Sequence, residues 1–125
     1  MNILIVDDQR RSRQSLRALI ATWPAIRTIR DAANGAEALR LAGDCRPNLV
    51  IIDGRMTAVG GLEVVQRIKD RWPDIGVVVL SMYSDFEPDA VAAGADAFVT
   101  KGESPEILLR ILEAVAKRRE QLKKS

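Results

Sequence analysis

Residues 49–53 read Leu-Val-Ile-Ile-Asp, four apolar residues without a polar break followed by a carboxylate. A strand with one face in water alternates apolar and polar residues, so a continuous apolar run indicates a strand that is covered on both faces. Three further runs have the same character, and they are Ile3–Val6, Val77–Leu80 and Ala97–Val99. The four runs predict a parallel sheet with helices packed on both sides.

Segments with the apolar spacing of helices separate these runs. Their markers are Leu16, Leu19 and Ile20 in the first segment, Ala36, Ala38, Leu39 and Leu41 in the second, and Leu62, Val65, Ile68 and Lys69 in the third. A short helix is expected from near Pro88 to just before Gly94. The last helix is the clearest, because Ser104 can cap it and Pro105 suits its first turn. A weaker alternating run, Ala25–Arg30, predicts an edge strand.

Strands that alternate with helices from end to end predict an α/β fold. Five such units in 125 residues favour an open, doubly wound sheet of five parallel strands with five helices over a barrel. No repeat or low-complexity segment interrupts the pattern, so we expect one domain over residues 1–118. Residues 119–125 are interpreted as a charged C-terminal tail or the start of a linker.

Composition limits the classes of function. The chain has no histidine, which excludes His-based acid/base catalysis and the usual zinc sites. Cys45 is its single cysteine, cannot form an internal disulfide and is interpreted as a buried small residue. No apolar run approaches the roughly 18 residues of a membrane span, and no signal peptide is present, so we expect a reduced, cytoplasmic protein.

The net charge of +2 is small but unevenly distributed. Basic residues gather in two clusters. The early cluster consists of Arg10, Arg11, Arg13 and Arg17, and the cluster at the end of the chain consists of Lys117, Arg118, Arg119, Lys123 and Lys124. Such clusters can bind nucleic acid or acidic lipid, but no aromatic residue is interleaved with these, so bases have no stacking platform. We interpret the clusters as a solvated helix face and a charged tail, with no direct DNA binding and no membrane contact.

Polar residues follow the predicted strands at the edge where open α/β sheets bind their ligands. The residues that end the strands are Asp7 and Asp8, Asp53, Ser81, and Thr100 with Lys101. Clustered carboxylates raise one another's pKa values unless a cation joins them, and a hard ion such as Mg²⁺ resolves that conflict while leaving positions open for phosphate oxygens. A carboxylate beside such a metal is a competent nucleophile toward phosphorus.

This set of residues resembles the receiver domains of two-component response regulators, over nearly the whole chain. The pattern resembled is an acidic pair after strand one, an aspartate after strand three, Ser or Thr after strand four and Lys after strand five. The run Ala93–Lys101 and the helix start at Ser104 resemble the NarL/FixJ branch. The resemblance implies a flavodoxin-like sheet with strand order 2-1-3-4-5.

The resemblance also implies a role for each residue of the set. Asp53 is expected to be the phosphoacceptor, and Asp7, Asp8, Asp53 and the main-chain carbonyl of Arg55 to be the metal ligands. The phosphate-contacting and switch residues are expected to be Ser81, Lys101 and Phe98, and the residues that control access to the phosphoryl group to be Arg55, Met82 and Tyr83. The implied cofactor is Mg²⁺, for which Mn²⁺ can substitute.

The implied protein is a phosphorylation-activated switch that catalyses only its own phosphorylation and dephosphorylation. Its expected partners are a sensor histidine kinase or phosphotransfer protein and an attached or partner effector, often DNA-binding and regulating transcription. The effector contacts the fourth helix, the fifth strand and the last helix, and a phosphorylation-dependent homodimer is a further expectation.

Three features depart from the family pattern. Thr57 stands where proline is usual, Gly102 follows the lysine where many relatives have proline, and the stretch from Ser81 to Lys101 is about two residues short by family standards. A haloacid-dehalogenase-like hydrolase is disfavoured, since Asp7-Asp8-Gln9 lacks the Asp-x-Asp spacing. A nucleotide site would need a Gly-rich loop after the first strand. The remaining alternative is a pseudo-receiver that binds partners without phosphorylation.

Overall fold

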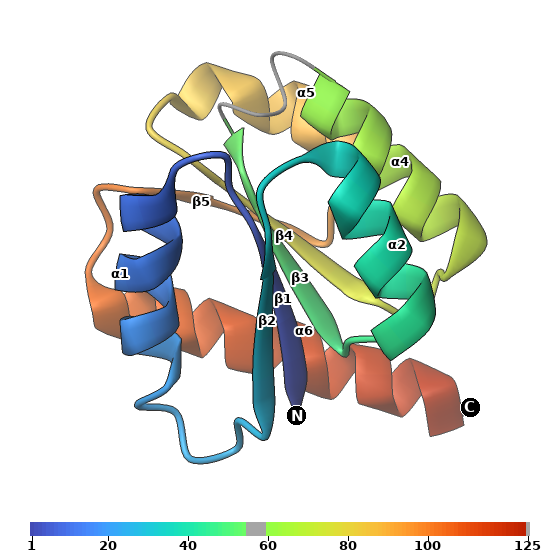
Figure 1. The fold of residues 1–125 in the computed structure, drawn as a ribbon, viewed down its shortest axis with the longest axis horizontal. Helices are drawn as coiled ribbons and strands as arrows, with labels where there is room; N and C mark the ends of the chain where they lie inside the picture. The colour runs from blue at the N-terminus through green and yellow to red at the C-terminus, as the bar shows by residue number, and fades with distance from the viewer. Residues whose placement is uncertain (55–59, 125) are drawn as a thin grey trace.

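The computed structural model describes residues 1–54 and 60–124, and its centre is a single five-stranded sheet (Figure 1). The strands are β1 (Asn2–Val6), β2 (Thr28–Ala32), β3 (Leu49–Asp53), β4 (Gly76–Ser81) and β5 (Ala97–Thr100). All neighbouring strands pair in parallel, in the order β2-β1-β3-β4-β5. Every residue of β3 and β4 is buried, as their unbroken apolar runs predicted. The predicted fold class and strand order are confirmed.

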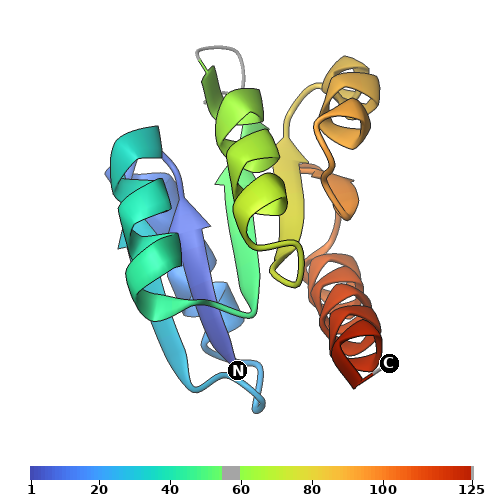
Figure 2. The same cartoon turned by 90° about the vertical axis from the view of Figure 1, so that its right-hand side faces the viewer.

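Helices cover both faces of the sheet, which makes the fold doubly wound (Figures 1 and 2). They are α1 (Arg10–Ile20), α2 (Gly35–Cys45), α4 (Leu62–Arg71), the six-residue α5 (Glu87–Ala92) and α6 (Pro105–Lys124), with a 3₁₀ turn, η2 (Ser84–Phe86), before α5. One apolar core lies under α2, α4 and α5 and includes Val65, Ile68 and Ala90. The other lies under α1 and α6 and includes Ile20, Leu108 and Leu112.

The edge strand was predicted at the wrong residues. β2 covers Thr28–Ala32 rather than Ala25–Arg30. The Met1 ammonium donates to the carbonyl of Ala25, and the amide of Ile26 donates to the carbonyl of Trp23, so this segment is a turn rather than a strand. Ile26 packs against the core under α1 from within that turn. A partly buried turn residue therefore produced the alternating pattern that suggested a strand.

The last helix extends further than its apolar stripe. α6 is continuous to Lys124, so the predicted domain boundary after residue 118 falls inside a helix, although the boundary itself stays a prediction. The Arg119 guanidinium bonds to the Asp74 carbonyl oxygen at 3.4 Å and approaches Asp96 Oδ1 at 3.5 Å. Over residues 1–54 and 60–124, no helix is both long and apolar enough to cross a membrane.

Candidate functional site

The predicted site residues meet where β1, β3, β4 and β5 end. The pairing of Val6 with Ile52 and of Ser81 with Thr100 brings the strand ends to one edge of the sheet. Asp7, Asp53 and Ser81 are 4%, 3% and 1% exposed, and they are the buried polar residues of the described ranges. Since burial of a polar group costs free energy unless the group has partners, three such groups at one edge mark a candidate functional site.

The three carboxylates form one cluster, in which one oxygen each of Asp7, Asp8 and Asp53 lies within 4.8 Å of the others. Burial raises the pKa of Asp7, and the neighbouring Asp53 carboxylate raises it further. The Gln9 amide, 2.8 Å from Asp7 Oδ1, and the Lys101 charge oppose that rise in the pKa of Asp7. The cluster is therefore short of positive charge, and its oxygen donors fit a hard divalent cation such as Mg²⁺.

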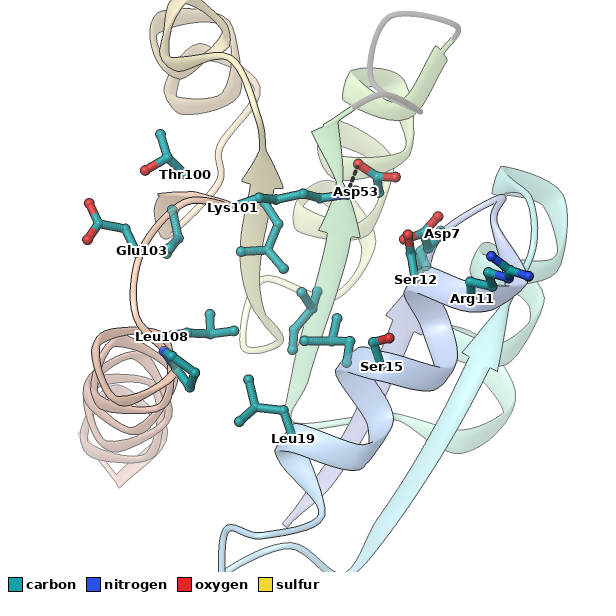
Figure 3. Close-up of a pocket in the computed structure, with 16 residues that line it drawn as sticks. Asp7, Arg11, Ser12, Ser15, Leu19, Asp53, Thr100, Lys101, Glu103 and Leu108 are labelled. Carbon is teal, nitrogen blue, oxygen red and sulfur yellow. Dashed lines mark ion pairs between the residues drawn. The ribbon is translucent and has the colours of Figure 1, made fainter.

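Lys101 brings a positive charge into contact with the acidic cluster. Its Nζ lies 3.0 Å from Asp53 Oδ1, and its side chain reaches across the end of β4 to that carboxylate (Figure 3). Its main-chain amide donates to the Ser81 carbonyl at 2.8 Å, which holds the segment after β5 against β4. The lysine side chain remains 24% exposed, so it can follow a group that binds at Asp53.

The residues expected to act as switch and gate surround Ser81. The Ser81 hydroxyl accepts a hydrogen bond from the Tyr83 amide at 3.0 Å. Phe98 lies on β5 opposite Val79 and packs, half-buried, against the core under α2, α4 and α5. Met82 and Tyr83 are 67% and 57% exposed beside the site. The predicted metal-ligand and access position at Arg55, and the departure at Thr57, lie outside the described residues.

Gly54 is a site residue whose role the sequence analysis missed. A Cβ atom at this position would lie 2.4 Å from the Ser81 Cβ and 2.8 Å from the Leu80 carbonyl oxygen. The ends of β3 and β4 therefore approach so closely that the residue after Asp53 has no room for a side chain. The glycine directly after a strand-ending aspartate was the available signal.

Gly54→Ala is expected to lower the free energy of unfolding by about 1–3 kcal/mol, because the added methyl group must displace Ser81 or the end of β4. Urea unfolding monitored by circular dichroism measures this loss. Gly102→Ala is the matched control, since a Cβ at Gly102 meets no atom within 4 Å, and its stability should stay within about 0.5 kcal/mol of wild type. Equal stability of both variants would show that the close approach at Gly54 is relieved without cost.

A cavity of about 420 Å³ opens beside the cluster on the side of α1 (Figure 3). Asp53 and Lys101 line one part of it, and Leu16, Leu19 and Leu108 line another. The cavity therefore lies between α1 and the segment that joins β5 to α6, with Asp7 and Asp53 in its wall.

The chain was compared with known families and proteins. A family described as "Response regulator receiver domain" matches residues 3–113. The uncharacterized transcriptional regulatory protein YhcZ of Bacillus subtilis is 37% identical over 112 residues, which are 88% of this chain and 52% of that protein. The nitrate/nitrite response regulator NarL of Escherichia coli is 33% identical over 117 residues, 91% of this chain and 54% of NarL. The chain thus spans about half the length of these relatives.

Solved structures agree with these matches. A two-component response regulator of the LuxR family from an Aurantimonas species superposes with a TM-score of 0.87 at 31% identity, covering 94% of this chain and 86% of that one. A CheY-like receiver domain protein from Methanospirillum hungatei has a TM-score of 0.85 at 23% identity, covering 96% of both chains. The second similarity supports the fold alone.

Proposed function

Because this chain belongs to the response regulator receiver family, we propose that it is a signalling switch whose Asp53 accepts a phosphoryl group from a sensor histidine kinase or phosphotransfer protein. One observation carries the proposal: a buried carboxylate lies within 4.8 Å of two others and 3.0 Å from a lysine ammonium group. That arrangement combines a nucleophile with charges suited to phosphate oxygens.

In the proposed reaction an Asp53 oxygen attacks the phosphorus atom of phosphohistidine in line. The oxygen–phosphorus bond forms as the phosphorus–nitrogen bond breaks, and the imidazole leaves with that electron pair. Lys101 offsets charge on one phosphoryl oxygen, and the Ser81 hydroxyl can donate to another once it turns away from the Tyr83 amide. Asp7, Asp8, Asp53 and the Arg55 carbonyl would hold Mg²⁺ or Mn²⁺, which lowers the repulsion between the carboxylates and the incoming phosphate when bound.

The output is proposed to run through the surface formed by α5, β5 and α6. Ser81 ends β4 and Phe98 lies one strand away on β5, so a turn of the serine toward the phosphoryl group opens space that the aromatic ring can fill. An effector, attached or separate and of the DNA-binding kind that regulates transcription, would read that change, as would a second copy in a phosphorylation-dependent homodimer. The chain modifies itself and is no metabolic enzyme.

Mg²⁺ is expected to stabilise the wild-type fold, by about 1.4 kcal/mol when its free concentration is ten times the dissociation constant. Asp8→Ala should remove most of this effect, because it takes one of the three clustered carboxylates away. Urea unfolding at several Mg²⁺ concentrations measures both values. Equal stabilisation of wild type and Asp8→Ala would contradict the assigned metal site, and no stabilisation of wild type would favour the pseudo-receiver alternative.

Met82 and Tyr83 are proposed to slow hydrolysis of the phosphorylated form by crowding the approach of water. Both side chains are exposed beside Ser81, and Tyr83 packs edge-on against Phe86 at 6.4 Å between ring centroids, which limits its motion. A tenfold change in rate needs only about 1.4 kcal/mol. Met82→Ala and Tyr83→Ala should each speed phosphate release severalfold, while Val91→Ala, an exposed apolar control on α5, should leave it unchanged. Wild-type rates in both test variants would contradict the crowding.

A further inference from the structure

Arg13 differs from the other arginines of α1 in what it contacts. Its Nη1 donates to the main-chain carbonyl oxygen of Asp7 at 2.7 Å, and the residue is half-buried. Arg10 and Arg11 are exposed, and neither side chain has a hydrogen bond or ion pair within residues 1–54 and 60–124. Arg13 therefore does not belong to the solvated helix face to which its sequence cluster was assigned.

The bond from Arg13 acts on the peptide unit that joins Asp7 to Asp8. On one side of that unit the Asp7 amide donates to the Ala32 carbonyl at 3.1 Å, and the Asp7 carboxylate accepts from the Gln9 amide at 2.8 Å. With its carbonyl held as well, the unit has one orientation, and that orientation fixes the positions of the Asp8 amide and Cα, from which the carboxylate side chain extends.

Asp8 depends on this support more than the other two carboxylates do. Asp7 and Asp53 are buried, and surrounding atoms restrict their side chains. Asp8 is exposed, and within the described part of the chain its side chain has no hydrogen bond or ion pair. An exposed ligand on a short turn keeps its place only if the main chain beneath it is fixed.

We propose that Arg13 is a positioning residue for the cation that the Asp7, Asp8 and Asp53 carboxylates hold, a role that rests on the function proposed above. Two effects of its guanidinium have opposite signs. Its positive charge repels a divalent cation and weakens binding, whereas its hydrogen bond to the Asp7 carbonyl orders Asp8 and strengthens binding. The proposal is that the hydrogen bond outweighs the charge.

Arg11 separates the two effects, because it has the charge without the contact. Arg11 lies two residues before Arg13 on the same helix, and it lines the same cavity as Asp7 and Asp53 (Figure 3). Arg11→Gln and Arg13→Gln remove the same charge from the first turn of the same helix, two residues apart. Charge alone predicts tighter Mg²⁺ binding in both variants, and positioning predicts weaker binding in Arg13→Gln only.

The experiment is a Mg²⁺ titration of the whole chain at low ionic strength, followed by the NMR shifts of the Asp8 and Gln9 amides. Arg13→Gln should raise the dissociation constant about tenfold, at the low end of losses seen when the partners of metal ligands are removed. Arg11→Gln should lower it about twofold, and moderate salt should abolish that gain. Arg13→Lys keeps a charge and a donor and should bind within about threefold of wild type. In the metal-free state, only Arg13→Gln should shift the Asp8 amide.

Urea unfolding of the metal-free variants shows whether each variant is folded. If Arg13→Gln is unfolded, the Mg²⁺ titration of Arg13→Lys tests the positioning role instead. Mg²⁺ binding by Arg13→Gln as tight as wild type, or tighter as in Arg11→Gln, would overturn the positioning role while leaving the proposed function in place. Binding by Arg13→Lys more than tenfold weaker than wild type, with an unshifted Asp8 amide, would overturn it too. A wild-type chain that binds no Mg²⁺ would overturn the metal site and the positioning role together.

Discussion

Asp53→Asn is expected to abolish phosphorylation of the chain and leave it folded. The amide nitrogen and oxygen occupy nearly the same volume as the carboxylate, so the buried end of β3 can keep its packing, but an amide is no competent nucleophile toward phosphorus. Asp53 is 3% exposed and is the carboxylate that Lys101 contacts, so no other acidic side chain has its surroundings within the described residues.

The stability of Asp53→Asn reflects two opposing changes. The substitution removes a negative charge that contributes to the raised pKa of Asp7, which relieves repulsion in the cluster. It also removes the ion pair with Lys101. The lysine side chain is partly exposed, so water screens this pair. We expect unchanged or slightly raised stability in thermal melts without Mg²⁺.

Asp44→Asn is the matched control for this substitution. Asp44 is an exposed carboxylate near the end of α2 that lies 3.8 Å from Arg40, and α2 leads to the start of β3 rather than to the edge where β3 ends. The Asp44→Asn variant should be phosphorylated at the wild-type rate when a phosphoryl donor and Mg²⁺ are supplied. Phosphate-retarding gels follow the reaction. Phosphate on Asp53→Asn at wild-type stoichiometry would place the acceptor on a different residue.

Asp96→Ala is expected to cost about 3 kcal/mol of unfolding free energy, the largest effect on stability that the structure predicts. Asp96 Oδ2 accepts from the Lys69 ammonium at 2.9 Å and from the Val77 amide at 2.8 Å, and its Oδ1 lies 3.5 Å from the Arg119 guanidinium. The side chains of Asp96, Lys69 and Arg119 are 7%, 14% and 16% exposed. The carboxylate thus joins strand β4 to two helices, α4 and α6, which lie on opposite faces of the sheet.

Removing Asp96 leaves two partly buried cations without their shared anion. Lys69 keeps bonds to the Pro73 and Ile75 carbonyls, and Arg119 keeps its bond to the Asp74 carbonyl, which is why we expect the lower end of the usual penalty for breaking a buried ion pair. Urea unfolding measures the loss, and the dependence of the unfolding free energy on urea concentration should stay unchanged. Asp44→Ala, which removes a surface pair, should cost no more than about 0.5 kcal/mol. A loss below about 1 kcal/mol in Asp96→Ala would contradict the cost assigned to this network.

The sequence predicted that the residues of the candidate site lie together, because parallel strands bring their carboxyl ends to one edge. Four unbroken apolar runs located four strands, so the polar residues that follow them had to meet, and Asp7, Asp53, Ser81 and Lys101 do so. The weak point was β2, where the partly buried Ile26 in a turn produced an alternating pattern that began three residues before the strand.

Contacts between residues far apart in the sequence could not be predicted in this way. Lys69 was taken as part of an apolar helix stripe, whereas its ammonium group bonds to Asp96, 27 residues away. The need for glycine at Gly54 depends on how closely the ends of β3 and β4 approach, which strand register and packing decide. Arg13 was grouped with its neighbours by charge, and its bond to Asp7 depends on how the chain turns between β1 and α1.

Peptide-level mass measurement shows whether Asp53 accepts a phosphoryl group with the help of a divalent cation. The chain is incubated with acetyl phosphate, with Mg²⁺ or with a chelator, then digested and analysed under conditions that preserve acyl phosphates. We predict one phosphoryl group on the peptide that contains Asp53, in the Mg²⁺ sample only. A phosphoryl group on another peptide, or an unmodified chain in the presence of both acetyl phosphate and Mg²⁺, would contradict the proposed function.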